Sequence, residues 1–312
     1  MTSIVFMGTP DFSAPILEML VEEGYNVLAV VTQPDRPVGR KKVLTPPPVK
    51  VEALRHGLEV LQPEKLSGSL EEQRLVELQP DLIVTAAFGQ LLPESVLELP
   101  KLGCINVHAS LLPAYRGGAP IHQAVMDGQS HTGVTIMYMV KKLDAGDIIS
   151  QVEVAIEDTD TTGILFDKLS LAGKNLLKDT LPFIIDGTNK RVPQDESLVT
   201  YARNISREQE RMDWTNTSTT LWNQVRGLNP WPGAYTTFEG QNVKVWRAKR
   251  VKGKTGAKPG EIIRNDKEFV IQTGDGEALA IYEIQPAGKK KLSIDEFLRG
   301  VGSTYTLGAR FE

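Results

Sequence analysis

The sequence predicts an α/β domain with a mostly parallel sheet, followed by a smaller β-barrel domain. Three observations predict this fold class. Apolar runs of strand length alternate with helical patterns over residues 1–189. From residue 206 onward, short strands are separated by turns instead. The net charge also changes sign, from −9 over residues 1–189 to +5 over residues 190–312.

The first domain opens with a strand at residues 4–7 and a helix at residues 14–23, for which Ser13 is a candidate N-cap. The later elements continue this alternation. Strands are expected at residues 27–32, 81–85, 104–108, 132–139 and 150–156, and helices at residues 49–56, 70–78 and 164–185. Because strands and helices alternate, we expect a Rossmann-like sheet covered by helices.

The second domain follows a polar connection that contains Pro193. We predict a first domain over residues 1–189, a linker over 190–205 and a second domain over 206–312. A helix is expected around residues 219–226, and strands at residues 234–238, 243–250, 260–263, 268–273 and 278–285. Five short strands suggest a small closed barrel, for which the oligonucleotide-binding fold is one candidate. Core packing is expected for the tryptophans of this part: Trp214, Trp222, Trp231 and Trp246.

The composition is that of a globular protein, with 41% hydrophobic and 24% charged residues. The first apolar run is too short for a signal peptide or a membrane span, so we expect a cytoplasmic protein without a membrane partner. Cys104 is the single cysteine. It cannot form an internal disulfide, and we expect a buried thiol.

Charge is distributed unevenly along the chain. Residues 1–189 carry 15 Lys and Arg against 24 Asp and Glu, whereas residues 190–312 carry 20 against 15. The asymmetry suggests an anionic partner for the second part, although ordinary variation between domains explains it equally well. Residues 244–258 hold seven cations and no acid, and three more lysines follow at 289–291. Phosphate contact is favoured there over the alternative, a solvated strand edge.

The candidate active site lies where the strand at residues 104–108 ends. Side chains alternate along a strand, so Ile105 and Val107 face one side while Asn106 and His108 face the other. An asparagine amide donates hydrogen bonds to a developing oxyanion, and a histidine exchanges protons near neutral pH. Asp144, in the turn after the next strand, is the natural third member. In open α/β sheets, ligands bind at this carboxyl edge.

A dinucleotide enzyme is the obvious rival for such a sheet. The first turn, residues 8–13, lacks the Gly-x-Gly-x-x-Gly pattern, and Pro10 removes a backbone N–H that would hold a pyrophosphate. Hydride transfer is therefore not expected.

Five segments resemble the folate-dependent formyltransferases, and together they span both parts of the chain: residues 8–12, 33–37, 108–113, 143–147 and 229–232. The resemblance implies that 10-formyltetrahydrofolate donates its formyl group to the α-amine of methionine on initiator tRNA, giving N-formylmethionyl-tRNA. It also implies a barrel of the oligonucleotide-binding type in the second domain. The family's most familiar form has glycine where this chain has Ala109, a small departure that leaves the assignment intact.

By position in the motif, the resemblance implies that Asn106 stabilises the oxyanion, His108 moves the proton and Asp144 orients His108. A second version, in which Asp144 takes the proton directly, stays open. No metal is expected, because the histidines show no ligand spacing and the cysteine has no partner.

Folate is expected against two loops at the same edge of the sheet: Phe88, Gly89, Gln90, Leu92, Ser110, Leu111, Leu112 and Pro113. Initiator methionyl-tRNA is expected to contact the proline-rich loop at residues 33–48 and the barrel: Arg36, Arg40, Lys41, Lys42, Lys244, Arg247, Lys249 and Arg250. We expect the loop to be mobile without tRNA, Arg40 to matter most within it, and the protein to be a monomer.

Three rival functions share part of this pattern. A formyltransferase acting on a small sugar or nucleotide amine, or a formyltetrahydrofolate hydrolase, would use the same three residues. Neither gives a reason for the basic loop and the positive barrel. An RNA-binding protein without activity would not need Asp144 opposite the Asn-x-His strand.

Overall fold

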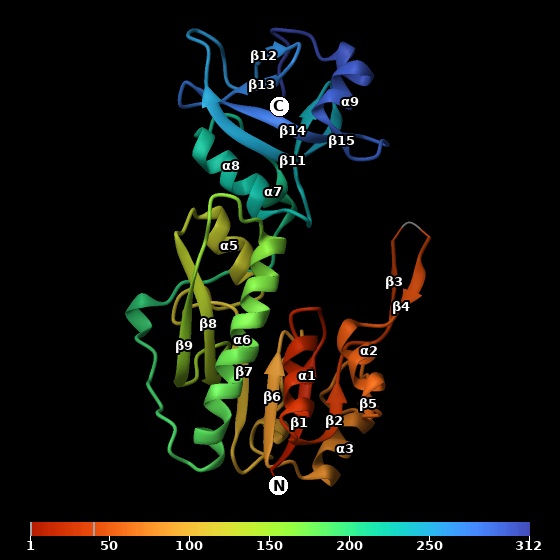
Figure 1. Cartoon of the computed structure of the whole chain (residues 1–312), viewed down its shortest axis with the longest axis vertical. Helices are drawn as coiled ribbons and strands as arrows, with labels where there is room; N and C mark the ends of the chain where they lie inside the picture. The colour runs from red at the N-terminus through yellow and green to blue at the C-terminus, as the bar shows by residue number, and fades with distance from the viewer. Residues whose placement is uncertain (1, 40) are drawn as a thin grey trace. The chain divides into compact units, whose positions relative to one another are not determined.

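The computed structural model describes residues 2–39 and 41–312 (Figure 1). Contacts divide the chain into two compact units. The first unit comprises Met1–Pro120, His131–Ala155 and Phe166–Arg203, and the second comprises Ile121–Ser130, Ile156–Leu165 and Asn204–Glu312. The division passes through two helices, α5 (Pro120–Met126) and α6 (Thr162–Ile185). Most of the segment predicted as a linker therefore groups with the first unit.

Within the described residues, the first unit is built on a seven-stranded sheet. Its strands lie in the order β5 (Val60–Leu61), β2 (Asn26–Val31), β1 (Ser3–Gly8), β6 (Leu82–Ala86), β7 (Cys104–His108), β8 (His131–Tyr138) and β9 (Ile148–Ala155). The pairs from β5 to β7 are parallel, whereas β8 and β9 are antiparallel to their neighbours. The predicted α/β fold with a mostly parallel sheet is confirmed.

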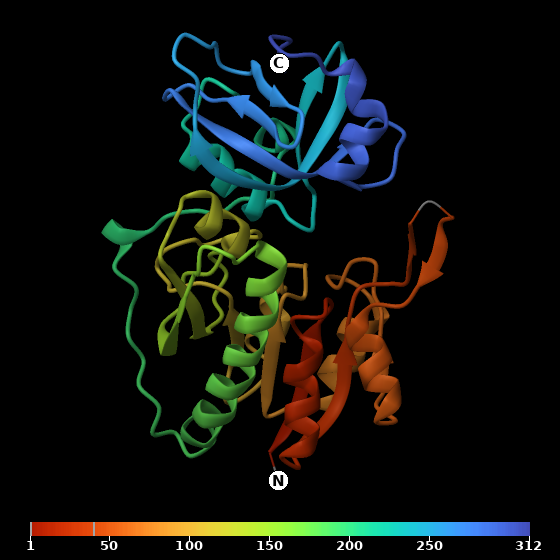
Figure 2. The same ribbon diagram turned by 45° about the horizontal axis from the view of Figure 1, so that its top comes forward.

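Helices cover both faces of this sheet (Figures 1 and 2). One face carries α1 (Ala14–Glu22), α2 (Pro48–Arg55) and α6, and the other carries α3 (Leu70–Leu78) and α4 (Glu94–Leu97). Gly173 of α6 lies so close to β7 that a Cβ there would be 2.9 Å from Val107. On the opposite face, Leu75 and Val96 pack in one buried cluster with Cys104. Val107 and Cys104 thus point to opposite faces, as strand alternation predicts.

The first turn of the sheet is held tightly against the neighbouring strand. A Cβ on Gly8 would lie 2.9 Å from the carbonyl oxygen of Ala86, so a larger residue does not fit there. Ser13 occupies the N-cap position of α1, but its side chain makes no capping hydrogen bond. The predicted N-cap position is confirmed, but the Ser13 hydroxyl donates to Ala86 O at 2.6 Å instead of accepting from the helix.

The proline-rich segment at residues 33–48, expected as a loop, contains a two-stranded antiparallel hairpin, β3 (Arg36–Val38) and β4 (Val43–Thr45). It projects away from the main sheet in both ribbon views (Figures 1 and 2). Val38, Val43 and Leu44 are each more than half exposed. The sequence did not indicate strands here because β3 is only three residues long and has Pro37 at its centre, and proline is unfavourable inside a strand.

The second unit holds an antiparallel sheet of six strands among the described residues. The main path is β10 (Ala234–Phe238), β11 (Gln241–Lys252), β14 (Glu277–Pro286), β13 (Phe269–Gln272) and β12 (Ile262–Asn265), and β15 (Leu292–Ser293) pairs with β14. Residues 308–312 bridge the two edges: Glu312 exchanges backbone hydrogen bonds with Thr237, and Phe311 N donates to Gly260 O at 2.9 Å. The expected closure is thus made by this segment rather than by direct pairing of β10 with β12.

Helices complete the second unit. The predicted helix is α8 (Ser218–Gly227), whereas α7 (Arg207–Glu210) and α9 (Ile294–Arg299) were not anticipated. The stretch Ile156–Leu165, which belongs to this unit, is joined to the C-terminal part of α8 by two hydrogen bonds. Arg226 Nη1 donates to Glu157 O at 3.0 Å, and the Thr162 hydroxyl donates to Gly227 O at 2.6 Å.

The expectation that all four tryptophans pack in the core was wrong. Trp214 is 3% exposed, but Trp231 is 44% exposed. Trp222 and Trp246 are half-buried, and each has a cation over its ring, such as Arg250 at 4.6 Å from the Trp222 centroid. Five other aromatic residues pack against one another in the buried cluster of this unit, together with a larger number of aliphatic side chains: Phe238, Phe269, Phe297, Tyr305 and Phe311.

No helix in the part of the chain that the structure describes is long and apolar enough to cross a membrane.

Candidate active site

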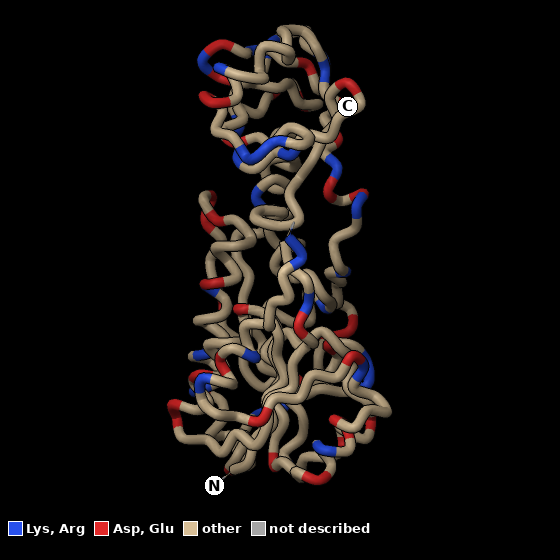
Figure 3. Tube along the Cα trace, turned by 90° about the vertical axis from the view of Figure 1, so that its right-hand side faces the viewer, with Lys and Arg blue, Asp and Glu red and all other residues tan. Residues whose placement is uncertain are grey.

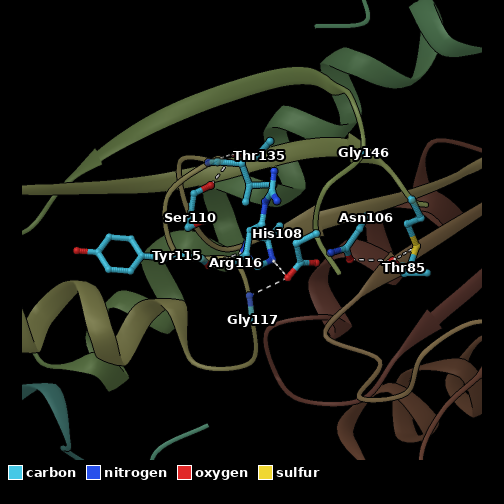
Figure 4. A network of polar contacts seen from close by, with 12 residues as sticks. Thr85, Asn106, His108, Ser110, Tyr115, Arg116, Gly117, Thr135 and Gly146 are labelled. Carbon is cyan, nitrogen blue, oxygen red and sulfur yellow. Dashed lines mark hydrogen bonds and ion pairs between the residues drawn. The ribbon is translucent and has the colours of Figure 1, made fainter. Parts of the chain in front are cut away.

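Asn106 lies near the carboxyl end of β7, beside Thr85 of the adjacent strand β6 (Figure 4). The Thr85 hydroxyl donates to Asn106 Oδ1 at 2.7 Å. Thr85 is 2% exposed, so this bond is shielded from water. Because the side-chain oxygen is occupied in this way, the amide nitrogen is the group that Asn106 presents to a ligand. Thr85 was not predicted as a site residue, because the sequence does not show that its side chain contacts Asn106.

His108 is the last residue of β7 and is 6% exposed. Its Nε2 lies 3.0 Å from the carbonyl oxygen of Tyr115 (Figure 4), and its Nδ1 lies 3.8 Å from Asp144 Oδ2. A carbonyl oxygen only accepts hydrogen bonds, so Nε2 carries the hydrogen in this contact. In the neutral ring, Nδ1 therefore holds the lone pair and faces the carboxylate.

Asp144 is fixed by the backbone around it. Its Oδ2 accepts a hydrogen bond from Gly117 N at 2.8 Å, and its own φ is +46°, in the left-handed region. Gly146 allows the turn to close, since a Cβ there would lie 1.8 Å from Tyr138 O. The structure thus brings together the side chains that the sequence predicted as a triad, with the carboxylate on the Nδ1 side of His108.

Cys104 begins the same strand but has a different environment. Burial raises the pKa of its thiol to about 12, and the Sγ atom donates to Val96 O at 3.4 Å. The thiol is therefore uncharged near neutral pH and is not a nucleophile in this site.

Of the residues expected to contact folate, the first group lies on the segment after β6. Phe88 is 4% exposed, and its carbonyl oxygen accepts hydrogen bonds from the Thr9 hydroxyl at 3.0 Å and Gln33 Nε2 at 3.1 Å. Gly89 has a φ of +88°. The Gln90 side chain bonds to the neighbouring segment, accepting from Leu66 N at 2.8 Å. Leu92 is 9% exposed.

The second group follows His108. Ser110 is fully buried, and its hydroxyl donates to Ala114 O at 2.7 Å. Leu112 is 3% exposed, with its N–H donated to the Thr135 hydroxyl at 3.1 Å. Leu111 lies against Gly133, where a Cβ would be 2.5 Å from it, and Pro113 follows a cis peptide bond. These contacts shape the loop from within, and the assignment of both groups to folate stays a prediction.

The predicted tRNA contacts lie on two surfaces. Arg36, on β3, pairs with Glu64, whereas Lys41 and Lys42 are exposed at the hairpin turn. Arg40 falls outside the described residues.

The other predicted contacts lie on β11 of the second unit. The tube view draws all described Lys and Arg residues in blue (Figure 3). Arg247 and Lys249 are exposed, and Lys244 Nζ donates to Pro232 O at 2.8 Å. Arg250 Nη1 donates to the Thr219 hydroxyl at 3.0 Å. A role in RNA binding stays a prediction for all of them.

No group of three or more His, Cys, Asp or Glu among residues 2–39 and 41–312 is placed to hold a metal ion.

A parallel sheet with an amide donor, a histidine and a carboxylate at its carboxyl edge is an arrangement suited to acyl transfer. Comparison with known sequences gives the class of protein. Residues 1–181 match the profile of the formyl transferase family, and residues 204–302 match that of the formyl transferase C-terminal domain. The chain belongs to this family.

Two relatives that match this chain over nearly its full length carry the name methionyl-tRNA formyltransferase. The protein from Lysinibacillus sphaericus (strain C3-41) is 64% identical over 313 residues, covering 100% of both chains. The protein from Bacillus subtilis (strain 168) is 60% identical over 301 residues, covering 96% of this chain and 95% of that one.

Solved structures at lower identity share the fold. An N-formyltransferase from Helicobacter canadensis, in complex with folinic acid and dTDP-3-aminofucose, has a TM-score of 0.69 at 19% identity and covers 92% of this chain and 100% of that one. HypX from Aquifex aeolicus, in complex with tetrahydrofolic acid, has a TM-score of 0.65 at 21% identity and covers 95% of this chain. The chain spans 47% of the length of that HypX protein.

Proposed function

We propose that this chain transfers the formyl group of 10-formyltetrahydrofolate to the α-amine of methionine on initiator tRNA. The observation that carries the proposal is the arrangement of His108, whose Nδ1 lies 3.8 Å from Asp144 Oδ2 while Asn106 presents its amide from the same strand. The full-length relatives named methionyl-tRNA formyltransferase support this acceptor.

Formyl transfer needs three things from the site. The attacking amine must lose a proton, the formyl oxygen gains negative charge, and N10 of the folate must be protonated before it leaves. In the proposed mechanism the Asn106 amide donates to the developing oxyanion. His108 Nδ1 accepts the amine proton and then delivers it to N10. Asp144 already accepts a hydrogen bond from Gly117 at 2.8 Å, so we assign it the stabilisation of the imidazolium rather than proton abstraction.

We further propose that the folate site lies in residues 1–189 and that residues 206–312 bind tRNA. The donor loops and the three reactive side chains all lie before residue 149, whereas the acid-free run of cations lies on β11 and beyond. The chain is proposed to act as a cytoplasmic monomer, because the three reactive side chains come from one unit of one chain.

An acceptor panel tests the reaction. The protein is incubated with 10-formyltetrahydrofolate and either methionyl initiator tRNA, a nucleotide-linked amino sugar, or water alone, and each product is identified by mass. We expect one formyl group on the methionine amine. Formylation of the amino sugar, release of formate, or binding of tRNA without turnover would each identify one of the rival functions instead.

The hairpin tests the tRNA assignment separately. Replacing both Lys41 and Lys42 by alanine should lower kcat/KM for tRNA and reduce the slope of log affinity against log salt by about one for each lost phosphate contact. Folate affinity should not change. Lys190→Ala, which removes another exposed lysine, is the control. Equal tRNA kinetics in the double variant and the control would exclude the hairpin lysines from the interface.

A further inference from the structure

We propose that Gln194 is a positioning residue for Asp144, and that residues 191–202 act as part of the catalytic site rather than as a passive connection. This inference rests on the proposed function, since it assigns Gln194 a role in the same reaction.

The side-chain amide of Gln194 is fully occupied. Its Nε2 donates to Asp144 O and to Gly146 O, both at 2.8 Å. Its Oε1 accepts from Arg116 Nε at 3.0 Å and from Arg116 Nη2 at 2.8 Å. A carbonyl only accepts and a guanidinium only donates, so the amide fits in one orientation only. One side chain therefore ties the turn of Asp144 to Arg116.

Arg116 provides a rigid anchor for this bond. It is fully buried, and within the described residues its Nη1 has no hydrogen-bond partner. Its Nη2 also pairs with Glu196 at 3.0 Å, and Glu196 in turn pairs with Lys142 at 2.6 Å. A buried guanidinium without its acceptors is costly, so Arg116 and Gln194 hold one another in place.

The backbone of the same segment holds the loop on the other side of Asp144. Arg116 N donates to Thr200 O at 2.9 Å, and Ala202 N donates to Arg116 O at 2.8 Å. A Cβ on Gly117 would lie 2.4 Å from Ala202 O, which shows how closely the two strands of chain approach. The Gly117 N–H that binds the Asp144 carboxylate is thus positioned by residues 200–202.

Asp144 therefore has two supports, and both depend on residues 191–202. Gln194 holds its backbone carbonyl, and Gly117 holds its carboxylate. Its φ of +46° is a conformation that persists only when the surroundings favour it. Loss of the Gln194 support should let the turn relax and move the carboxylate away from His108 Nδ1.

Gln194→Glu tests this positioning with a side chain of nearly the same shape. The carboxylate still accepts from Arg116 but faces Asp144 O and Gly146 O with an acceptor, so both of those hydrogen bonds are lost. We expect kcat to fall by about 10²-fold, the effect of a displacement of about 1 Å, with little change in KM for either substrate. Gln194→Asn, which keeps the amide on a side chain one methylene shorter, is assayed in the same way if the first variant does not fold.

Gln224→Glu is the matched control. Gln224 Nε2 also donates to two backbone carbonyls, Gln209 O at 2.8 Å and Arg211 O at 3.0 Å, but in the second unit. The control should lose a similar amount of thermal stability and keep the normal kcat. If both variants lose the same fraction of kcat, Gln194 has only a structural role and the inference is overturned.

A double variant identifies the route of the effect. If Gln194 acts through Asp144, then Gln194→Glu should have no further effect on kcat in the Asp144→Ala background. If the two substitutions together lower kcat by the product of their separate effects, the inference is overturned. If Asp144→Ala turns over slowly but Gln194→Glu turns over normally, only the positioning role of Gln194 is excluded. If Asp144→Ala turns over normally, both the proposed mechanism and the positioning role are excluded.

Discussion

Thr85→Val isolates the hydrogen bond that orients Asn106. Threonine and valine have nearly the same shape, so packing around this 2%-exposed residue is kept. The substitution removes the hydroxyl, whose shortest hydrogen bond is the one to Asn106 Oδ1 at 2.7 Å, while Ile105 O lies farther away at 3.1 Å. The Asn106 amide then loses the contact that distinguishes its oxygen from its nitrogen, and it is free to turn its oxygen toward the reacting formyl group.

The size of the effect follows from that one bond. A hydrogen bond of this kind contributes about 1–1.5 kcal/mol to stability. If the same free energy keeps the amide in the productive orientation, kcat should fall by about 5–10-fold, because 1.36 kcal/mol corresponds to about one factor of ten in rate. Removal of the whole donor in Asn106→Ala should cost more, about 10²–10³-fold. Thr85→Val is therefore expected to lie between the wild type and Asn106→Ala.

The assay is formylation at saturating folate and tRNA, together with urea unfolding. Thr132→Val is the matched control, because Thr132 is 3% exposed on β8 and its hydroxyl has no hydrogen-bond partner within the described residues. The control should keep its kcat and be as stable as the wild type or more so, since a buried unpaired hydroxyl is unfavourable. A Thr85→Val variant that loses stability but keeps the full kcat would refute the orienting role.

Three further predictions concern the site and its strand. His108→Ala and Asp144→Ala should lower kcat by about 10²–10⁴-fold and Asn106→Ala by about 10²–10³-fold, each with only the small loss of unfolding free energy expected for its lost hydrogen bond, and single-turnover formylation at a near-normal rate would remove that residue from the mechanism. The hydrogen bond from Lys101, together with that from Ser3 N, lowers the pKa of Asp81 from 3.8 to about 2, so its stabilisation is complete above pH 3.8 and is lost as pH falls toward about 2. The difference in unfolding free energy between wild type and Asp81→Asn should therefore vanish in that window, and a difference that persists at about pH 2 would contradict the assignment. Burial raises the pKa of Cys104 to about 12, so a thiol reagent at neutral pH should modify it only in denaturant, and rapid labelling of the native protein would contradict its burial.

The fold was predictable where hydrophobic periodicity and turn residues agreed. The helix expected at residues 70–78 is α3 (Leu70–Leu78), and the strand expected at 104–108 is β7 (Cys104–His108). In both segments the hydrophobic pattern is clear enough for the local sequence to predict the type of secondary structure. The pairing of Asn106 with His108 on one face followed from strand alternation alone.

The elements that were missed have no such pattern. The hairpin strands β3 and β4 are three exposed residues each, so their sequences do not show the alternation of apolar and polar residues that burial of one face produces. The barrel is closed by Glu312 and Phe311 through backbone hydrogen bonds to distant residues. Backbone pairing of this kind does not depend on side-chain identity, and single-sequence reasoning does not detect it.

The partners of the reactive groups were missed for a related reason. Asn106 is oriented by Thr85, 21 positions earlier in the chain, and Asp144 is held by Gln194, 50 positions later. Neither threonine nor glutamine is unusual in its local segment, and only the folded chain brings them to the site.

Each reactive side chain is held by a group from another segment, because polar atoms in a partly buried site must be hydrogen-bonded and each hydrogen bond has a direction. The bond from Thr85 that satisfies Asn106 Oδ1 also turns its amide nitrogen toward a ligand. The contact between His108 Nε2 and Tyr115 O likewise leaves Nδ1 as the basic nitrogen. Substitution of a reactive group or of its orienting partner removes the same hydrogen bond, so both should cost stability. Substitution of the reactive group should cost the larger fraction of kcat, as in Asn106→Ala compared with Thr85→Val, and that difference separates the two classes of residue in a single pair of measurements.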